Sequence, residues 1–175
     1  WAEKVTFPDG LQTIGNEAFD RNGLKELEIP ESVSYIGKSA FSWCRKLEEV
    51  KLPENPTKLS DKIFYECNAL EKVVLPNNLE SIGDEVFYEC GLNKLEIPES
   101  VSSIGSDAFS QCRNLEEVNI PKGITKVNKG TFFGCSSLKK IDLPENLESI
   151  GENAFRGCMK FQEIKIPETV SSIGN

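Results

Sequence analysis

The stretch "ESVSYIGKSAFSWCRKLEEVKLP", residues 31–53, holds one copy of the pattern from which the chain is built. In its tail, Val50 and Leu52 alternate with Glu49 and Lys51, which is the period-two signature of a strand with one buried face. Pro53 ends that strand because it offers no amide hydrogen for a further ladder bond. The stretch therefore predicts one short strand per copy.

The same pattern returns every 22 or 23 residues, as seven full repeats and the start of an eighth. Its repeat prolines are Pro8, Pro30, Pro53, Pro76, Pro98, Pro121, Pro144 and Pro167, and its phenylalanines are Phe19, Phe41, Phe64, Phe87, Phe109, Phe132 and Phe155. A unit this short cannot bury its apolar residues alone, whereas stacked units bury a continuous column. The spacing therefore predicts a solenoid with parallel strands about 4.8 Å apart.

The rest of the unit predicts two further features. "VSYIG" forms a second short extended piece, and Gly37 closes it where we expect a positive φ. Ser60 and Asn128 replace glycine in this slot, and asparagine tolerates a positive φ best among the larger residues. "KSAFSWC" is too short for a full helix, so we expect one helical or 3₁₀ turn that inserts Phe41 into the core.

A longer rhythm groups the repeats in threes. Residues 8–75 align without gaps on residues 76–143, with about half of the positions identical, which indicates duplication of a three-repeat unit. We expect residues 1–175 to form a single repeat domain. Because the chain begins with Trp1 and stops at Asn175 in the middle of a repeat, we also expect it to be a fragment of a longer protein.

Composition argues against several classes of function. Twenty Lys and Arg stand against 28 Asp and Glu, and the net charge of −8 opposes binding to nucleic acid. No apolar run approaches the roughly 20 residues of a membrane-spanning helix, so we expect no membrane insertion in this segment. The sequence has no histidine, the commonest proton shuttle and metal ligand. We predict no catalytic residue, no cofactor and no metal site.

The cysteines keep the same period as the repeats. They are Cys44, Cys67, Cys90, Cys112, Cys135 and Cys158, and Asn22 takes their slot in the first repeat. Equal spacing places them one above another, so we favour a ladder of buried thiols, each donating weakly to a loop carbonyl, over disulfides. Zinc is less favoured still, because no pair such as CxxC occurs.

Two surfaces are candidates for binding a partner. The first is the outward face of the repeated strands, which carries Glu26, Glu28, Glu49, Lys51, Lys72, Val74, Lys94, Glu96, Glu117, Asn119, Lys140, Asp142, Glu163 and Lys165. It contains no aromatic residue, although binding hot spots favour Trp, Tyr and Arg. We therefore favour a solvated sheet in which unlike charges pair across strands over a dedicated binding site.

The second candidate surface lies at the turn after each core phenylalanine. This turn carries Trp43, Tyr65, Tyr88 and Phe133. Tyr65 and Tyr88 occupy adjacent repeats and could stack on each other. A row of exposed aromatics suggests a contact surface, but the same rings could instead shield the edge of the core. The sequence leaves these two interpretations about even.

The full pattern, I-P-x-x-V-x-x-I-G-x-x-A-F-x-x-C-x-x-L-x-x-I-x-I-P, resembles the BspA-like, or Treponema pallidum-type, leucine-rich repeat along the whole chain. The resemblance implies an α/β-type, mostly β, right-handed solenoid with its parallel sheet on the concave face. It also implies a surface or secreted protein. Some members of the family are associated with adhesion, and the motif contains no catalytic residue.

We therefore expect a non-catalytic protein-interaction or adhesion module whose partner is a host extracellular or cell-surface protein. A structural spacer or self-assembling surface element is one alternative. An accessory repeat domain of a larger enzyme is another.

Overall fold

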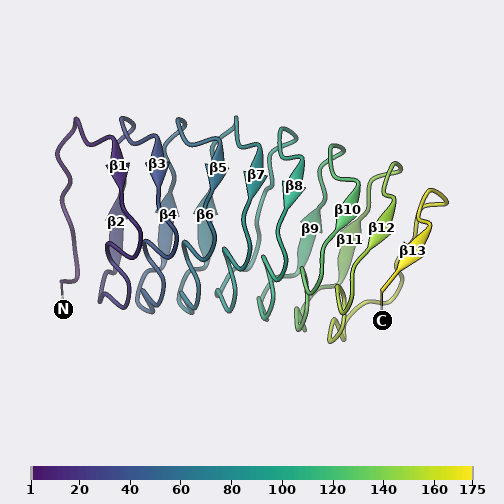
Figure 1. Ribbon diagram of the computed structural model, residues 1–175. Coiled ribbons are helices and arrows are strands. Elements are labelled where there is room, and N and C mark those ends of the chain that lie inside the picture. Colours follow the sequence, from purple (N-terminus) through teal and green to yellow (C-terminus); the bar gives the residue numbers. More distant parts are fainter. Residues whose placement is uncertain (1, 175) are drawn as a thin grey trace.

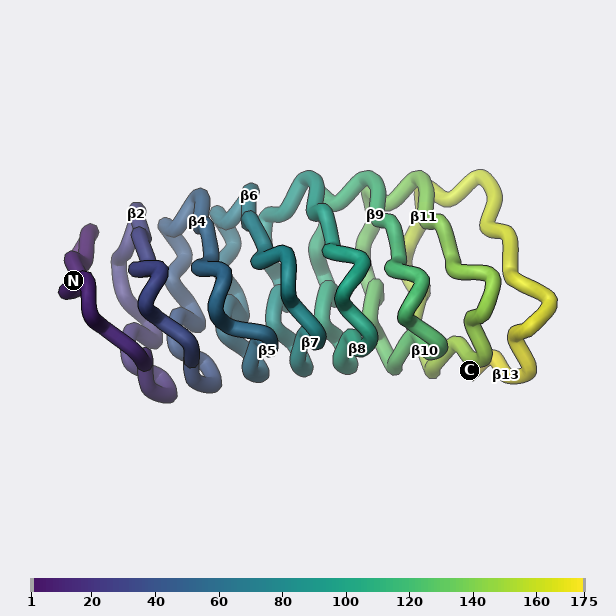
Figure 2. The backbone as a smooth tube through the Cα atoms, turned by 90° about the horizontal axis from the view of Figure 1, so that it is seen from above, coloured from purple at the N-terminus to yellow at the C-terminus, as the bar shows by residue number. Residues whose placement is uncertain are grey.

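The computed structural model describes residues 2–174, which form a series of coils stacked along one axis (Figures 1 and 2). Each coil runs from one repeat proline to the residue before the next. Coils 1 to 7 comprise residues 8–29, 30–52, 53–75, 76–97, 98–120, 121–143 and 144–166. Trp1 and Asn175, the residues behind the expectation of a longer parent protein, lie outside the described part.

A first series of strands follows the LxxVxL tail of the repeat. These strands are β2 (Glu26–Glu28), β4 (Glu49–Lys51), β6 (Lys72–Val74), β9 (Glu117–Asn119) and β11 (Lys140–Asp142). Neighbours pair in parallel, and the register places Val50 between Leu27 and Val73. In each strand the central residue is buried and the outer two are exposed, as the alternation in the sequence predicts.

A second series of two-residue strands lies nearer the viewer in Figure 1. They are β1 (Thr13–Ile14), β3 (Tyr35–Ile36), β5 (Lys58–Leu59), β7 (Ser81–Ile82), β8 (Ser103–Ile104), β10 (Lys126–Val127), β12 (Ser149–Ile150) and β13 (Ser172–Ile173). These strands also pair in parallel, for example Ser81 with Ser103. The two series form the two long sides of each coil.

The segment around each core phenylalanine contains no helix within residues 2–174, so the α/β-type label and the expected helical turn are wrong. The chain instead makes tight turns with two left-handed residues four positions apart, such as Ser39 (φ 56°) and Trp43 (φ 61°). A left-handed residue reverses the local winding, so a right-handed helix cannot continue through it. Most of these positions carry residues other than glycine, so residue type did not indicate them.

The glycine that closes the second strand was expected to have a positive φ, and this expectation is also wrong for Gly37 and its equivalents. Glycine is required there by close approach between coils. The Gly37 amide donates to the carbonyl oxygen of Ile14 in the coil before, at 2.8 Å. A Cβ atom on Gly37 would lie 2.5 Å from the backbone nitrogen of Asn16.

Coils 3 and 6 have a side chain in this glycine slot, and there the second series of strands is interrupted. Pairing stops between β3 and β5 and between β8 and β10. The side chain supplies the missing donor, since Ser60 Oγ donates to the Ile36 carbonyl at 2.7 Å and Asn128 Nδ2 donates to the Ile104 carbonyl at 2.6 Å. Each of these coils therefore stays joined to the coil before it through a side chain, where a Cβ atom separates the two backbones.

The first series is interrupted at a different place, between coils 3 and 4. Strand β6 has no strand partner in coil 4, where Lys94 makes only an isolated bridge to Glu117 in coil 5. Coil 4 is one of the two 22-residue repeats, and the missing residue precedes Leu92. Strands β5 and β7 pair across coils 3 and 4 on the other side of the solenoid, so strand pairing still joins the two coils there.

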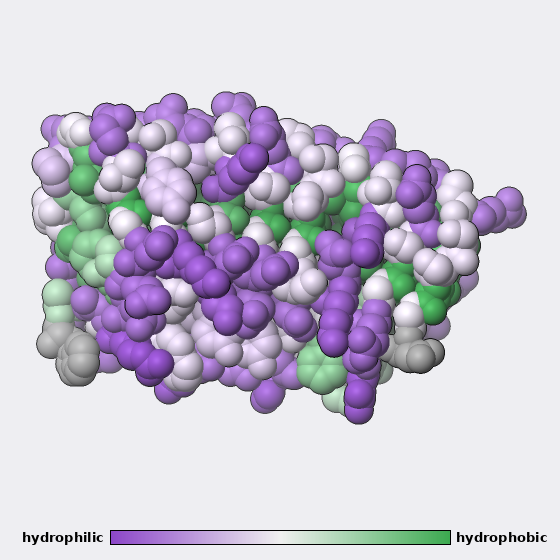
Figure 3. All heavy atoms as spheres, in the orientation of Figure 1, coloured by the Kyte–Doolittle hydropathy of each residue, from purple (hydrophilic) through white to green (hydrophobic). Residues whose placement is uncertain are grey.

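The core is a column of phenylalanines. From Phe19 to Phe155, successive ring centroids lie 5.4–5.9 Å apart and the ring planes differ by at most 12°. The five rings from Phe41 to Phe132 are completely buried. Figure 3 shows the apolar residues that reach the surface as an interrupted band between rows of polar side chains. Stacking of coils, as predicted, is what buries each unit's apolar residues.

Candidate functional site

The turn after each core phenylalanine is held by backbone hydrogen bonds between coils. The Trp43 amide donates to the Tyr65 carbonyl at 2.7 Å, and the Glu66 amide donates to the Tyr88 carbonyl at 2.7 Å. Because these bonds repeat at the same point of each coil, equivalent side chains emerge in a row. The row is therefore as rigid as the stacking beneath it.

Three aromatic side chains meet on this row. The Tyr65 and Tyr88 rings stack with centroids 4.8 Å apart and planes 10° apart, and the Trp43 and Tyr65 rings lie 6.1 Å apart at 47°. All three are partly exposed. Stacked rings of this kind cover each other's faces and turn their edges and hydroxyls toward solvent.

Two arginines lie over Trp43. The Arg21 guanidinium carbon is 4.6 Å from the ring centroid and that of Arg45 is 4.4 Å away, both within cation–π range. Arg45 also bonds Glu66 at 2.8 Å. We call Arg21, Trp43, Arg45, Tyr65 and Tyr88 the turn patch. The aromatics were predicted to form a row, but the arginines were not, although Arg45 two residues after Trp43 and Arg21 at the equivalent position of the preceding repeat were a usable signal.

Phe133 does not join the turn patch. It lies in coil 6, two coils beyond Tyr88, and the equivalent residue of coil 5 is Ser110, which is buried. Its aromatic ring is approached by Arg156, with 5.9 Å between guanidinium carbon and centroid. The expected row of four aromatics is therefore a cluster of three and a separate single ring.

Acidic residues surround the two tyrosines of the turn patch. Burial raises the pKa of the Tyr65 phenol, and the nearby Glu66 carboxylate raises it further. The pKa of Tyr88 is raised in the same way, first by burial and then by Glu89. Both phenols therefore keep their protons at neutral pH and can donate hydrogen bonds to a partner.

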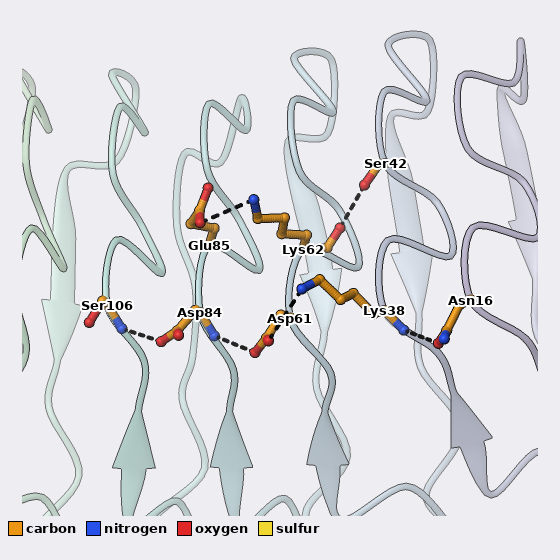
Figure 4. Close-up of polar contacts among 8 residues, drawn as sticks. All are labelled: Asn16, Lys38, Ser42, Asp61, Lys62, Asp84, Glu85 and Ser106. Carbon is orange, nitrogen blue, oxygen red and sulfur yellow. Dashed lines mark hydrogen bonds and ion pairs between the residues drawn. The ribbon is translucent and has the colours of Figure 1, made fainter.

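Directly after the second series of strands, carboxylate and amide side chains tie successive coils together (Figure 4). Asn16 Oδ1 accepts from the Lys38 amide at 2.9 Å, and Asp84 Oδ1 accepts from the Ser106 amide at 2.7 Å. Asp61 Oδ1 accepts from the Asp84 amide at 3.0 Å. These groups satisfy backbone donors between coils, so their role is structural.

On the exposed strand face, several of the charges pair with one another. Lys72 Nζ lies 2.6 Å from Glu49 Oε1 across adjacent strands, and Lys140 Nζ lies 3.1 Å from Asp142 Oδ2 along one strand. The structure places ten of the fourteen predicted strand-face residues in the first series of strands, and the other four outside strands. Those four are Lys94, Glu96, Glu163 and Lys165.

One apolar residue is exposed on the strand face. Val74 ends β6 and is 39 % exposed, at the interruption between coils 3 and 4. A groove of about 840 Å³ opens beside it, with Leu75 and Ile97 in its lining. The groove lies where strand pairing between coils 3 and 4 is missing.

The six cysteines stack as equivalents in successive coils, and all are free thiols. Each Sγ donates to the carbonyl of the phenylalanine in the preceding coil, at 3.0–3.3 Å. Burial raises the pKa of Cys44 and Cys158 to about 11 and that of Cys112 to about 12. It holds the pKa values of Cys67 and Cys90 well above the usual range. These thiols are therefore poor nucleophiles.

Within residues 2–174, no group of three His, Cys, Asp or Glu side chains is arranged to hold a metal ion. The same residues contain no helix long and apolar enough to cross a membrane.

The sequence matches the model of the BspA-type leucine-rich repeat region over residues 2–116 and again over residues 57–175. Among solved structures, a leucine-rich repeat protein of T. pallidum superimposes with a TM-score of 0.82. It is 34 % identical in sequence, and the match covers 87 % of this chain and 72 % of the other. No curated protein sequence matches.

Two further structures share the fold. A leucine-rich repeat protein of Bacteroides ovatus has a TM-score of 0.62 and 29 % identity, with 98 % of this chain and 62 % of the other covered. A leucine-rich cell surface protein of Faecalibacterium prausnitzii has a TM-score of 0.62 and 24 % identity, with 93 % and 59 % covered. The chain thus spans less than two thirds of the length of these two proteins.

Proposed function

The chain belongs to the BspA-type leucine-rich repeat family, and on that premise we propose that it is a non-catalytic protein-interaction module that binds its partner through the turn patch. The observation that carries this proposal is the cluster of Trp43, Tyr65 and Tyr88 on one edge of the solenoid, with two arginines stacked over Trp43. Trp, Tyr and Arg are the residue types enriched at binding hot spots.

Comparison of the two candidate surfaces favours the turn patch. On the strand face, exposed lysines and carboxylates neutralise each other, as Lys72 and Glu49 do, and such surface pairs contribute little energy. The turn patch differs in its aromatic edges and phenol donors, and its two arginines stack on Trp43 while they also pair with Asp20 and Glu66. In this proposal the strand face is the solvated concave side of a right-handed solenoid.

We further propose that the protein works at the cell surface or is secreted, with a host extracellular or cell-surface protein as its partner. Family membership supports this proposal, as does the similar Faecalibacterium prausnitzii structure, which is described as a cell surface protein. A role in adhesion is part of the same proposal.

The test measures binding of the chain to a panel of purified extracellular-matrix and cell-surface proteins by surface plasmon resonance. Any partner found is then presented to a triple variant, W43S/Y65S/Y88S, and to Phe133→Ser as the matched control. The control alters an aromatic residue of the same turn, two coils away from the patch. Circular dichroism and thermal unfolding verify that both variants fold.

Truncating a single hot-spot residue costs at least about 2 kcal/mol of binding free energy. We therefore expect the triple variant to lose binding while the control retains it. Equal affinity of the triple variant and the unmodified chain would reject the turn patch. Absence of binding to every panel member would favour the structural-spacer alternative, which requires no distinct partner.

A further inference from the structure

Asn22 occupies the cysteine slot of coil 1, and its side chain behaves differently from the cysteines. Each cysteine donates its thiol to the coil before, as Cys90 does to the Phe64 carbonyl at 3.1 Å. Asn22 turns back on its own backbone, and its Oδ1 accepts from the amide of the next residue, Gly23, at 2.8 Å. The backbone nitrogen of Gly23 is thus held against the Asn22 carboxamide.

This arrangement resembles the start of a known intramolecular reaction of asparagine. The carboxamide carbon is bonded to Oδ1 at about 1.2 Å, so the Gly23 nitrogen lies no more than about 4 Å from the carbon that it would attack, and attack occurs from roughly 3–3.5 Å. Gly23 has no side chain to obstruct the approach, and both residues are partly exposed, so water reaches them.

We propose that Asn22 is a site of spontaneous deamidation. The backbone nitrogen of Gly23 forms a bond to Cγ of Asn22, the bond from Cγ to Nδ2 breaks, and ammonia leaves with the amide proton. Water then opens the five-membered succinimide at either carbonyl and gives aspartate or isoaspartate. The net change replaces a carboxamide with a carboxylate and involves no oxidation or reduction.

The product has two consequences for coil 1. The new carboxylate is adjacent to Arg21, which stacks on Trp43 at 4.6 Å; an effect on partner binding would follow only if the proposed function holds. Isoaspartate also lengthens the backbone by one carbon at residue 22, two residues before Leu24, which is completely buried. We therefore expect the modified chain to hold coil 1 less tightly.

The chain contains an equivalent site that carries cysteine in place of asparagine. Cys90, Gly91 and Leu92 of coil 4 occupy the same positions as Asn22, Gly23 and Leu24 in the duplicated unit, 68 residues later. Asn22→Cys therefore converts the site to a sequence that the fold already accommodates, and it cannot form a succinimide.

The test incubates the intact folded chain at mildly alkaline pH and follows each asparagine by peptide mapping with detection of isoaspartate. Asn68 is the internal reference, because it precedes alanine and its side chain is engaged with the Glu89 carbonyl at 2.9 Å. Since the Gly23 nitrogen is already positioned, we expect Asn22 to convert at least about tenfold faster than Asn68, and Asn22→Cys to yield no product at this position.

A parallel incubation in denaturant separates the effect of the fold on the deamidation rate from the effect of the local sequence. If the folded geometry promotes the reaction, Asn22 converts at least as fast in the native chain as in the unfolded one. Conversion no faster than at Asn68, or slower in the native than in the unfolded chain, would overturn the proposal. Neither result depends on whether a partner binds the turn patch.

Discussion

Ser60 Oγ donates a hydrogen bond of 2.7 Å to the carbonyl oxygen of Ile36 in the coil before. In most coils the same carbonyl position receives a glycine amide, as when Gly37 donates to Ile14 at 2.8 Å. The glycine slot thus has two solutions. The coils either approach closely with no Cβ atom between them, or they separate and a polar side chain spans the gap.

Substitution at two glycines of this slot tests whether glycine is needed because the coils approach closely or because of its backbone conformation. We predict that Gly37→Ala destabilises the protein by roughly 1–3 kcal/mol, because its Cβ would lie 2.5 Å from backbone of coil 1. Gly15→Ala is the matched control, since nothing lies within 4 Å of a Cβ atom there. Urea unfolding measures both, and equal effects at the two sites would contradict this explanation.

Removal of the bridging hydroxyl tests the second solution. Ser60→Ala leaves the Ile36 carbonyl without its side-chain donor, and loss of a typical hydrogen bond costs about 1 kcal/mol. Ser103→Ala, on the exposed face of β8, should change the free energy of unfolding by less than about 0.5 kcal/mol. If thermal unfolding shows the same midpoint for both variants, the Ser60 bond contributes nothing.

The thiol ladder predicts a large contrast in cysteine reactivity. Five of the six cysteines are buried, so an aromatic disulfide reagent should modify them only after unfolding, with Cys158 first because it is partly exposed. All six thiols should react in denaturant without reductant. Recovery of fewer than four would indicate disulfides and refute the ladder.

The raised thiol pKa values predict how stability depends on pH. Burial raises the pKa of Cys112 to about 12, whereas an unfolded cysteine titrates near 8.5. Between these values the unfolded chain releases thiol protons that the folded chain retains, so stability is complete below about pH 8.5 and falls as pH rises toward 12. Denaturant titrations across this range measure the decline. Cys112→Ala should make the free energy of unfolding fall less steeply with pH. An unchanged slope would contradict the raised pKa of Cys112.

Much of the fold was predictable because the regular spacing of residues in the repeat determines how the coils stack. The periods of proline and phenylalanine predict stacking, and the alternation of Val50 with its neighbours predicts strands with one buried face. The turn geometry was not predictable, since left-handed positions such as Lys62 (φ 60°) carry residues with no preference for them. Tertiary stacking imposes that conformation, and sequence propensity does not report it.

The glycine slot shows a second limit of sequence reasoning. A glycine indicates either a positive φ or a close neighbour, and only the distance between coils decides which. For the candidate site, sequence placed the aromatics in one row but could not show which rings touch. Tyr65 and Tyr88 are in adjacent coils and stack, whereas Phe133 is separated from Tyr88 by coil 5, whose equivalent residue is Ser110.

Hydroxyl-radical footprinting of the chain with and without a bound partner tests the proposed interaction surface most directly, because tryptophan and tyrosine side chains react readily. We predict that the partner protects Trp43, Tyr65 and Tyr88 from oxidation while Phe133 and Tyr35 remain as reactive as in the free chain. Unchanged oxidation of the three turn-patch aromatics in the complex would contradict the account.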